Sequence, residues 1–231
     1  MQRRVVLMPL LLAGMGLTTL LTGCQAEVEV EAELEIGDIR ERETQGLFAT
    51  SQVSSEDCDR GTRSMEREGS AGWTTWVLSG VFPDTRYRSC RRTEAGAVTT
   101  FRNMIVFDAM PDAAFSGLSH VNIKLHDRLL SVGLPPYVQD NIERVREQAG
   151  LEDQPEIITR LTLVNNEDEP FGYRLARYDG QGAPNEDDIE WGEPRVLEAN
   201  ARVSLDYPSA LAERVFADGR APLLRIESTA D

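Results

Sequence analysis

The chain has 231 residues, of which 39 are acidic and 24 basic, and its formal charge at pH 7 is −15. A surface this acidic repels nucleic acid and anionic lipid head groups, so we expect no nucleic-acid partner. Lys124 is the only lysine, and arginine supplies all the other basic side chains. The length suffices for one large or two small hydrophobic cores.

The first residues predict a signal peptide of the bacterial lipoprotein type. Arg3 and Arg4 precede an apolar run over residues 5–21, and the sequence Leu-Thr-Gly then leads to Cys24. A positive start, an apolar segment and small residues before a cleavage site describe an export signal. We expect residues 1–23 to be removed, which would change the formal charge to −17, because two arginines and no acids are lost.

Cys24 would then carry the acyl chains, palmitate among them, that anchor the protein. A transmembrane helix over residues 5–21 is the less favoured alternative, because this run barely reaches the length that ~30 Å of hydrocarbon requires. Two or more acyl chains hold a protein stably at a membrane. Residue 25 is Gln rather than the Asp that commonly retains lipoproteins at the inner membrane. We therefore expect a protein of the bacterial cell envelope, lipid-anchored at the outer membrane and facing the periplasm.

The two remaining cysteines, Cys58 and Cys90, predict a disulfide. An exported protein resides in an oxidising compartment, where disulfides persist. The alternative of free or metal-binding thiols is disfavoured, because the chain has no CxxC spacing and no histidine near either cysteine.

Residues 27–36 predict a strand with one buried face. Val, Ala, Leu and Ile alternate with five glutamates over this segment, and a period of two is typical of a half-buried strand. The glutamate face is expected to be solvated, with capture of a cation as the less favoured alternative.

The rest of the first part is predicted to contain one helix and several strands. Trp73, Trp76 and Val81 recur at helical spacing before Phe-Pro-Asp ends the helix at residues 82–84. The two tryptophans are interpreted as the buried face of a short helix rather than as a binding stripe. Strands are expected at residues 45–53, 85–91, 98–108, 118–126 and 129–133.

The remaining sequence predicts two helices and a β-rich end. Pro135 and Pro136 open a helix that Gly150 ends. Beyond it we expect strands at residues 157–164, 171–178, 202–205 and 222–227, and a helix at residues 208–217. The predicted fold class is α+β, mostly antiparallel with three short helices. A disulfide-bonded part would span residues 24–150 and a sandwich-like part residues 151–231.

No pattern in the chain predicts a catalytic or metal site. As parts of one strand, His120 and His126 would share a face but lie roughly 20 Å apart, too far to bind one metal ion. Ser119 would point to the opposite face from His120, and no G-x-S-x-G elbow occurs. Calcium at the acidic segments 56–59, 165–169 and 185–188 is a weak alternative, because none has the EF-hand spacing.

Several segments together resemble an uncharacterised lipoprotein family of enterobacteria and their prophages. These are the run from Val81 through Pro83 and Tyr87 to Cys90, the segment Ser119 to Ile123, the stretch Leu130 to Arg146, and Leu163 to Asn166 with the following Pro170, Asp179 and Gly180. The resemblance implies an acylated Cys24 and a bridged pair, Cys58 and Cys90. It implies no activity, and this chain departs from the family in its acidity and scarcity of lysine.

We therefore expect a lipid-anchored, non-enzymatic binding or structural module without a cofactor. Its partners would be the membrane, through the N-terminal lipid, and a periplasmic or outer-membrane protein. The alternatives are a phage-related lipoprotein that modifies the host surface and, less favoured, an envelope hydrolase.

Overall fold

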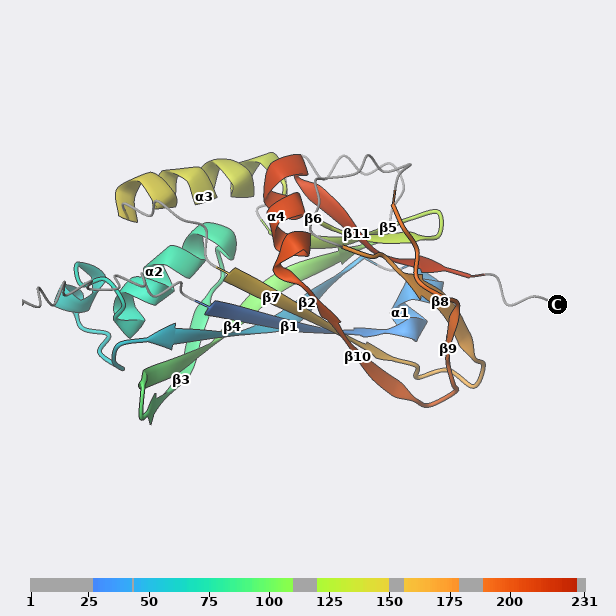
Figure 1. The fold of residues 1–231 in the computed structure, drawn as a ribbon, viewed down its shortest axis with the longest axis horizontal. Coiled ribbons are helices and arrows are strands. Elements are labelled where there is room, and N and C mark those ends of the chain that lie inside the picture. Colours follow the sequence, from blue (N-terminus) through green and yellow to red (C-terminus); the bar gives the residue numbers. More distant parts are fainter. Residues whose placement is uncertain (1–26, 43, 110–119, 150–155, 179–188, 228–231) are drawn as a thin grey trace, which may run out of the picture.

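The structure is a computed structural model that describes residues 27–42, 44–109, 120–149, 156–178 and 189–227. The strands are β1 (Glu27–Glu35), β2 (Gln45–Ser55), β3 (Arg86–Thr93), β4 (Gly96–Asp108), β5 (Asn122–His126), β6 (Leu129–Gly133), β7 (Glu156–Val164), β8 (Phe171–Leu175), β9 (Arg195–Leu197), β10 (Arg202–Tyr207) and β11 (Arg220–Ile226). The helices are α1 (Ile36–Glu41), the 3-10 helix η1 (Thr62–Met65), α2 (Ala71–Val81), α3 (Pro136–Ala149) and α4 (Ser209–Asp218). Figure 1 shows how they are arranged.

All of these strands belong to one mixed sheet, and the predicted fold class is therefore wrong. The strand order is β10-β7-β1-β2-β4-β5-β6-β11-β8-β9, with β3 paired to β4 beside this path. The sheet curls into a nearly closed barrel, and the protein is mostly β rather than α+β with a sandwich-like end. The expected second sheet is absent from the described residues because β7 and β10 extend the sheet beyond β1, while β11, β8 and β9 extend it beyond β6. Two pairs, β1 with β7 and β4 with β5, are parallel.

The alternating segment forms β1 as predicted, and its two faces have different partners. Val28, Ala32 and Leu34 are buried. On the other face, Glu29 accepts a hydrogen bond from Arg160 of β7 at 2.7 Å, and Glu33 pairs with Arg202 of β10. The glutamate face is thus part of an ion-pair network on the outer wall of the barrel.

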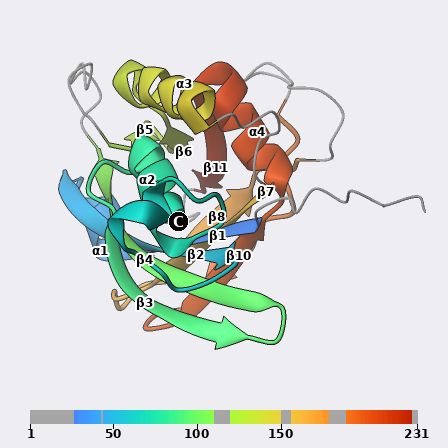
Figure 2. The same ribbon diagram turned by 90° about the vertical axis from the view of Figure 1, so that its left-hand side faces the viewer.

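Three helices cover the interior of the curled sheet. Figure 2 shows α3 and α4 side by side above α2, with β3 and β4 below α2. The α2 and α3 helices cross closely where Gly80 leaves room for Val145, since a Cβ at Gly80 would come within 2.9 Å of the valine side chain. Asn141 also donates to the carbonyl oxygen of Gly80 at 2.9 Å. The three predicted helices are confirmed, whereas α1 was not predicted.

The disulfide between Cys58 and Cys90 is present as predicted. It joins the segment after β2 to β3, whose one strand partner among the described residues is β4. Beside it, the ring of Tyr87 meets that of Phe101 edge-on at 6.3 Å, and the guanidinium of Arg60 lies 3.7 Å from the centre of the Tyr87 ring. The disulfide and these aromatic contacts hold the β3 strand and the segment after β2 against the barrel.

Asn165 links two segments at the opposite end of the barrel. Its fully buried side chain donates to the carbonyl oxygens of Glu169 at 2.8 Å, Leu197 at 3.1 Å and Glu198 at 3.0 Å. Its side-chain oxygen accepts from the backbone N–H of Glu167 at 3.2 Å. One amide side chain thus fixes the turn after β7 to the end of β9.

Candidate functional site

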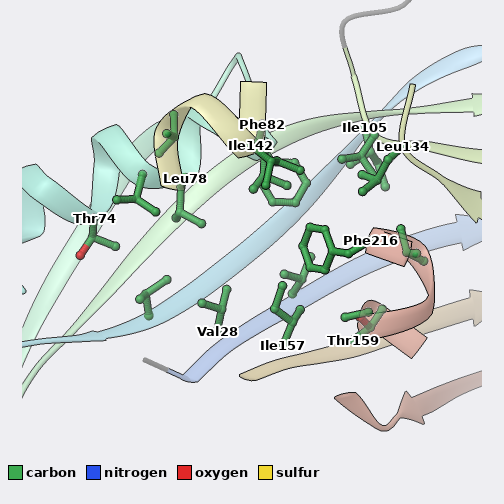
Figure 3. Close-up of a pocket in the computed structure, with 18 of the residues that line it drawn as sticks. Val28, Thr74, Leu78, Phe82, Ile105, Leu134, Ile142, Ile157, Thr159 and Phe216 are labelled. Carbon is green, nitrogen blue, oxygen red and sulfur yellow. The ribbon is translucent and has the colours of Figure 1, made fainter. Parts of the chain in front are cut away.

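A large apolar cavity lies between the curled sheet and its covering helices. Its volume is about 770 Å³, and most of the side chains that line it are hydrophobic. Figure 3 shows Val28, Ile157, Leu78 and Phe216 converging on it from strands and helices far apart in the sequence. A volume of this size falls within the roughly 300–1,000 Å³ typical of small-molecule sites.

The floor of the cavity follows from the alternation of β1 and β7. Val28, Val30 and Ala32 line it from β1, because inward residues recur every second position along a strand. The parallel register places Val28 opposite Ile157 and Ala32 opposite Leu161, and both of these β7 residues also line the cavity. Two neighbouring strands therefore supply one continuous apolar surface.

The roof of the cavity comes from the apolar faces of the three helices. It is formed by Trp73, Thr74, Val77, Leu78 and Val81 of α2, by Ile142, Val145 and Arg146 of α3, and by Leu211, Ala212, Val215 and Phe216 of α4. The α2 helix begins at Ser70, whose hydroxyl accepts a hydrogen bond from the backbone N–H of Trp73 at 3.1 Å. This cap satisfies one of the free donors of the first turn and fixes the start of the helix.

Charged residues line the cavity at a few positions only, namely Glu56, Glu68, Arg146 and Arg160. Arg160 already donates to Asp206 at 2.6 Å and to Glu29 at 2.7 Å, and these two acids raise the pKa of its guanidinium. Arg146 differs, because its Nε is buried without a hydrogen-bond partner. Its Nη1 lies 3.4 Å from the largely exposed Glu143.

The cavity is partly open to solvent rather than a sealed void, and most of its lining is hydrophobic. A hydrophobic lining offers water few hydrogen-bond partners. An apolar ligand that covers this lining removes apolar surface from water, which is favourable at ~25 cal/mol per Å². The cavity is therefore suited to an apolar ligand.

The two histidines have different partners. His120 lies before β5 and pairs with Asp84 at 2.7 Å, whereas His126 is the largely exposed last residue of β5. Within the described ranges, no group of three or more His, Cys, Asp or Glu side chains could hold a metal ion. Ser119 and Cys24 lie outside the described residues.

Two of the acidic segments that were weak candidates for calcium have partners within the protein. Asp57 accepts a hydrogen bond from the backbone N–H of Asp59 at 2.8 Å, and Asp59 accepts one from Gly61 at 2.9 Å. The bond from Gly61 is the main cause of the lowered pKa of Asp59. In the second segment, Glu167 and Glu169 each lie 3.4 Å from Arg40. The third segment, residues 185–188, lies outside the described part of the chain.

Sequence reasoning missed the cavity because its lining carries no motif. The Trp73 side chain lines it, so the interpretation of this helical stripe as ordinary core was incomplete. The remaining lining comes from strand and helix faces that look like core in the sequence. A cavity arises from how far apart these faces are held, and that spacing depends on the curvature of the sheet.

Comparison with protein-family models, curated proteins and solved structures gives no match for this chain. Within the described ranges, no helix combines the length and apolar character needed to cross a membrane.

Proposed function

We propose that this protein is a lipid-anchored lipoprotein of the bacterial cell envelope that binds a large apolar ligand in its interior, without catalysing a reaction. The observation that carries the proposal is the apolar cavity of about 770 Å³ beneath α2, α3 and α4. A site dominated by hydrophobic side chains with a few charges is typical of binding sites for small apolar molecules.

The sequence before β1 supports the anchored location. Cys24 follows Leu-Thr-Gly after an apolar segment with two arginines at its start, which is the pattern of a processed and acylated cysteine. The disulfide between Cys58 and Cys90 agrees with an oxidising compartment such as the periplasm. We infer that the folded part faces the periplasm from the outer membrane.

The anchoring is tested by cell fractionation of the wild type and of the Cys24→Ala variant. We expect the wild type in the membrane fraction after a carbonate wash, and the variant as a soluble, folded periplasmic protein. A variant that stays in the washed membranes would contradict the anchor.

The binding is tested with a fluorescent apolar probe, N-phenylnaphthylamine, added to the soluble Cys24→Ala protein. We expect saturable binding that Ala212→Phe weakens by about ten-fold, because the added ring occupies the cavity. Ala217→Phe is the matched control, since Ala217 is exposed on the same helix and does not line the cavity. Equal binding by the two variants would refute the proposed function. So would the absence of saturable binding by the Cys24→Ala protein itself.

A further inference from the structure

The cavity lies close to the proposed anchor along the chain. Val28 lines the cavity and is the second residue of β1. Val28 is four positions after Cys24 in the sequence. A chain spans at most ~3.3–3.6 Å per residue, so the covalent chain limits the distance between the two Cα atoms to about 14 Å. Ile157 of β7, opposite Val28 in the parallel register, lines the same end.

An anchor at this distance keeps the cavity beside a bilayer. Tethering replaces free diffusion by a high effective concentration of whatever the bilayer contains. Acyl chains are the main apolar molecules of a membrane, whereas the surrounding water contains few apolar compounds of this size. The closest abundant ligand for the cavity is therefore a lipid.

The volume of the cavity agrees with such a ligand. At ~30 Å³ for each molecule of liquid water, 770 Å³ corresponds to about 25 water molecules. A methylene group occupies slightly less space than a water molecule. The cavity can therefore hold one long acyl chain, or two short ones.

Arg146 offers a site for the charged group of a lipid. It lines the cavity from the last turn of α3, where a cation interacts favourably with the helix dipole. Its buried Nε has no hydrogen-bond partner. Its Nη1 pairs with Glu143 at 3.4 Å, whereas the other lining arginine, Arg160, is bound by both Asp206 and Glu29. Carboxylate and phosphate oxygens are the acceptors that a guanidinium binds best.

We propose that the cavity takes an acyl chain of a lipid from the anchoring bilayer, at the end lined by Val28 and Ile157, with the anionic head group bound by Arg146. The inference rests on the proposed function and names the class of its ligand.

The test uses the acylated protein in vesicles of phosphatidylglycerol whose acyl chains carry bromine, which quenches tryptophan fluorescence on contact. Trp73 lines the cavity, and the variant Trp76→Phe/Trp191→Phe keeps it as the only tryptophan. We expect loss of most of its emission in brominated vesicles compared with unbrominated ones. Adding Ala212→Phe should restore the emission, and adding Ala217→Phe should not.

The head-group contact is tested with Arg146→Gln against the control Arg225→Gln, an exposed arginine of β11 outside the cavity. We expect brominated fatty acid and brominated phosphatidylglycerol to bind Arg146→Gln roughly ten-fold more weakly, because a charge-assisted hydrogen bond is lost. Binding of N-phenylnaphthylamine should be unchanged. Equal lipid binding by both variants would overturn the assigned head-group contact.

The source of the lipid is tested by comparing vesicles with free brominated fatty acid in buffer. Quenching by the free fatty acid but not by the brominated vesicles would overturn the bilayer as source. Quenching in the Cys24→Ala protein but not in the acylated protein would mean that the protein's own acyl chain fills the cavity, which also overturns the proposal. If the naphthylamine probe binds and no lipid quenches, the ligand class is wrong while the proposed function stands.

Discussion

A larger side chain that fills the cavity from β1 should stabilise the protein. The same substitution on the neighbouring strand β2, outside the cavity, should destabilise it. Ala32 of β1 and Ala49 of β2 are direct cross-strand partners. Both are buried, but only Ala32 lines the cavity. The pair Ala32→Phe and Ala49→Phe therefore compares one substitution in two environments that differ in free space.

The expected magnitudes follow from area and packing. A phenyl ring at residue 32 would bury roughly 100 Å² of additional apolar surface, worth about 2.5 kcal/mol at ~25 cal/mol per Å². Fixing its rotamer costs about 0.5–1 kcal/mol, which leaves a gain of about 1–2 kcal/mol. At residue 49 the ring meets packed side chains, and overpacking costs typically 1–3 kcal/mol.

Thermal unfolding of the soluble Cys24→Ala protein, followed by circular dichroism, measures both variants. One kcal/mol shifts Tm by about 2–4 °C for a chain of this size. We expect Ala32→Phe to raise Tm by about 2–8 °C and Ala49→Phe to lower it. A fall in Tm of similar size for both variants would refute the existence of free volume above β1.

Three further measurements test the rest of the fold. Replacing Cys58 and Cys90 by alanine releases a crosslink with a sequence separation of 32, and urea unfolding should show a loss of about 3–4 kcal/mol, close to that caused by reductant on the wild type. Asn165→Ala should cost about 3 kcal/mol in the same assay, because three backbone carbonyl oxygens lose their donor. Burial raises the pKa of Tyr178 and Tyr207 above the usual 10.0. The free energy of unfolding that these two side chains contribute is therefore fully present below about pH 10 and is lost as the pH rises further. Replacing both by phenylalanine should therefore flatten the alkaline fall in stability, and an unchanged profile would contradict their burial.

The local structure could be predicted because it is encoded by neighbouring residues. The alternation of residues 27–36 predicted β1, and Pro135 and Pro136 predicted the start of α3. The helix that ends near Gly219 was also predicted, and this residue adopts φ +75°, which favours glycine. These signals act within one or two turns of the chain, so the folded neighbours hardly alter them.

The sheet could not be predicted, because the pairing partners lie far apart in the sequence. Alternation indicates which face of a strand is buried but not which strand lies beside it. The parallel pairing of β1 with β7 joins residues about 130 positions apart, as for Val28 and Ile157. Without this pairing, the later strands looked like a separate sandwich. The cavity could not be predicted from the sequence for the same reason, because β1 and β7 form its floor only when they are paired.

The period of two in β1 also bears on the proposal that this acidic protein holds an apolar molecule near a membrane. Each inward valine of this strand is followed by an outward glutamate, so the wall that is apolar inside is charged outside. On the proposed anchor, the acidic wall is repelled by anionic head groups and does not lie flat on the bilayer. With the proposed anchor, the short chain from Cys24 would hold only the end of the barrel near Val28 close to the bilayer. The alternation that forms the floor of the cavity would then also direct that end of the barrel toward the lipid.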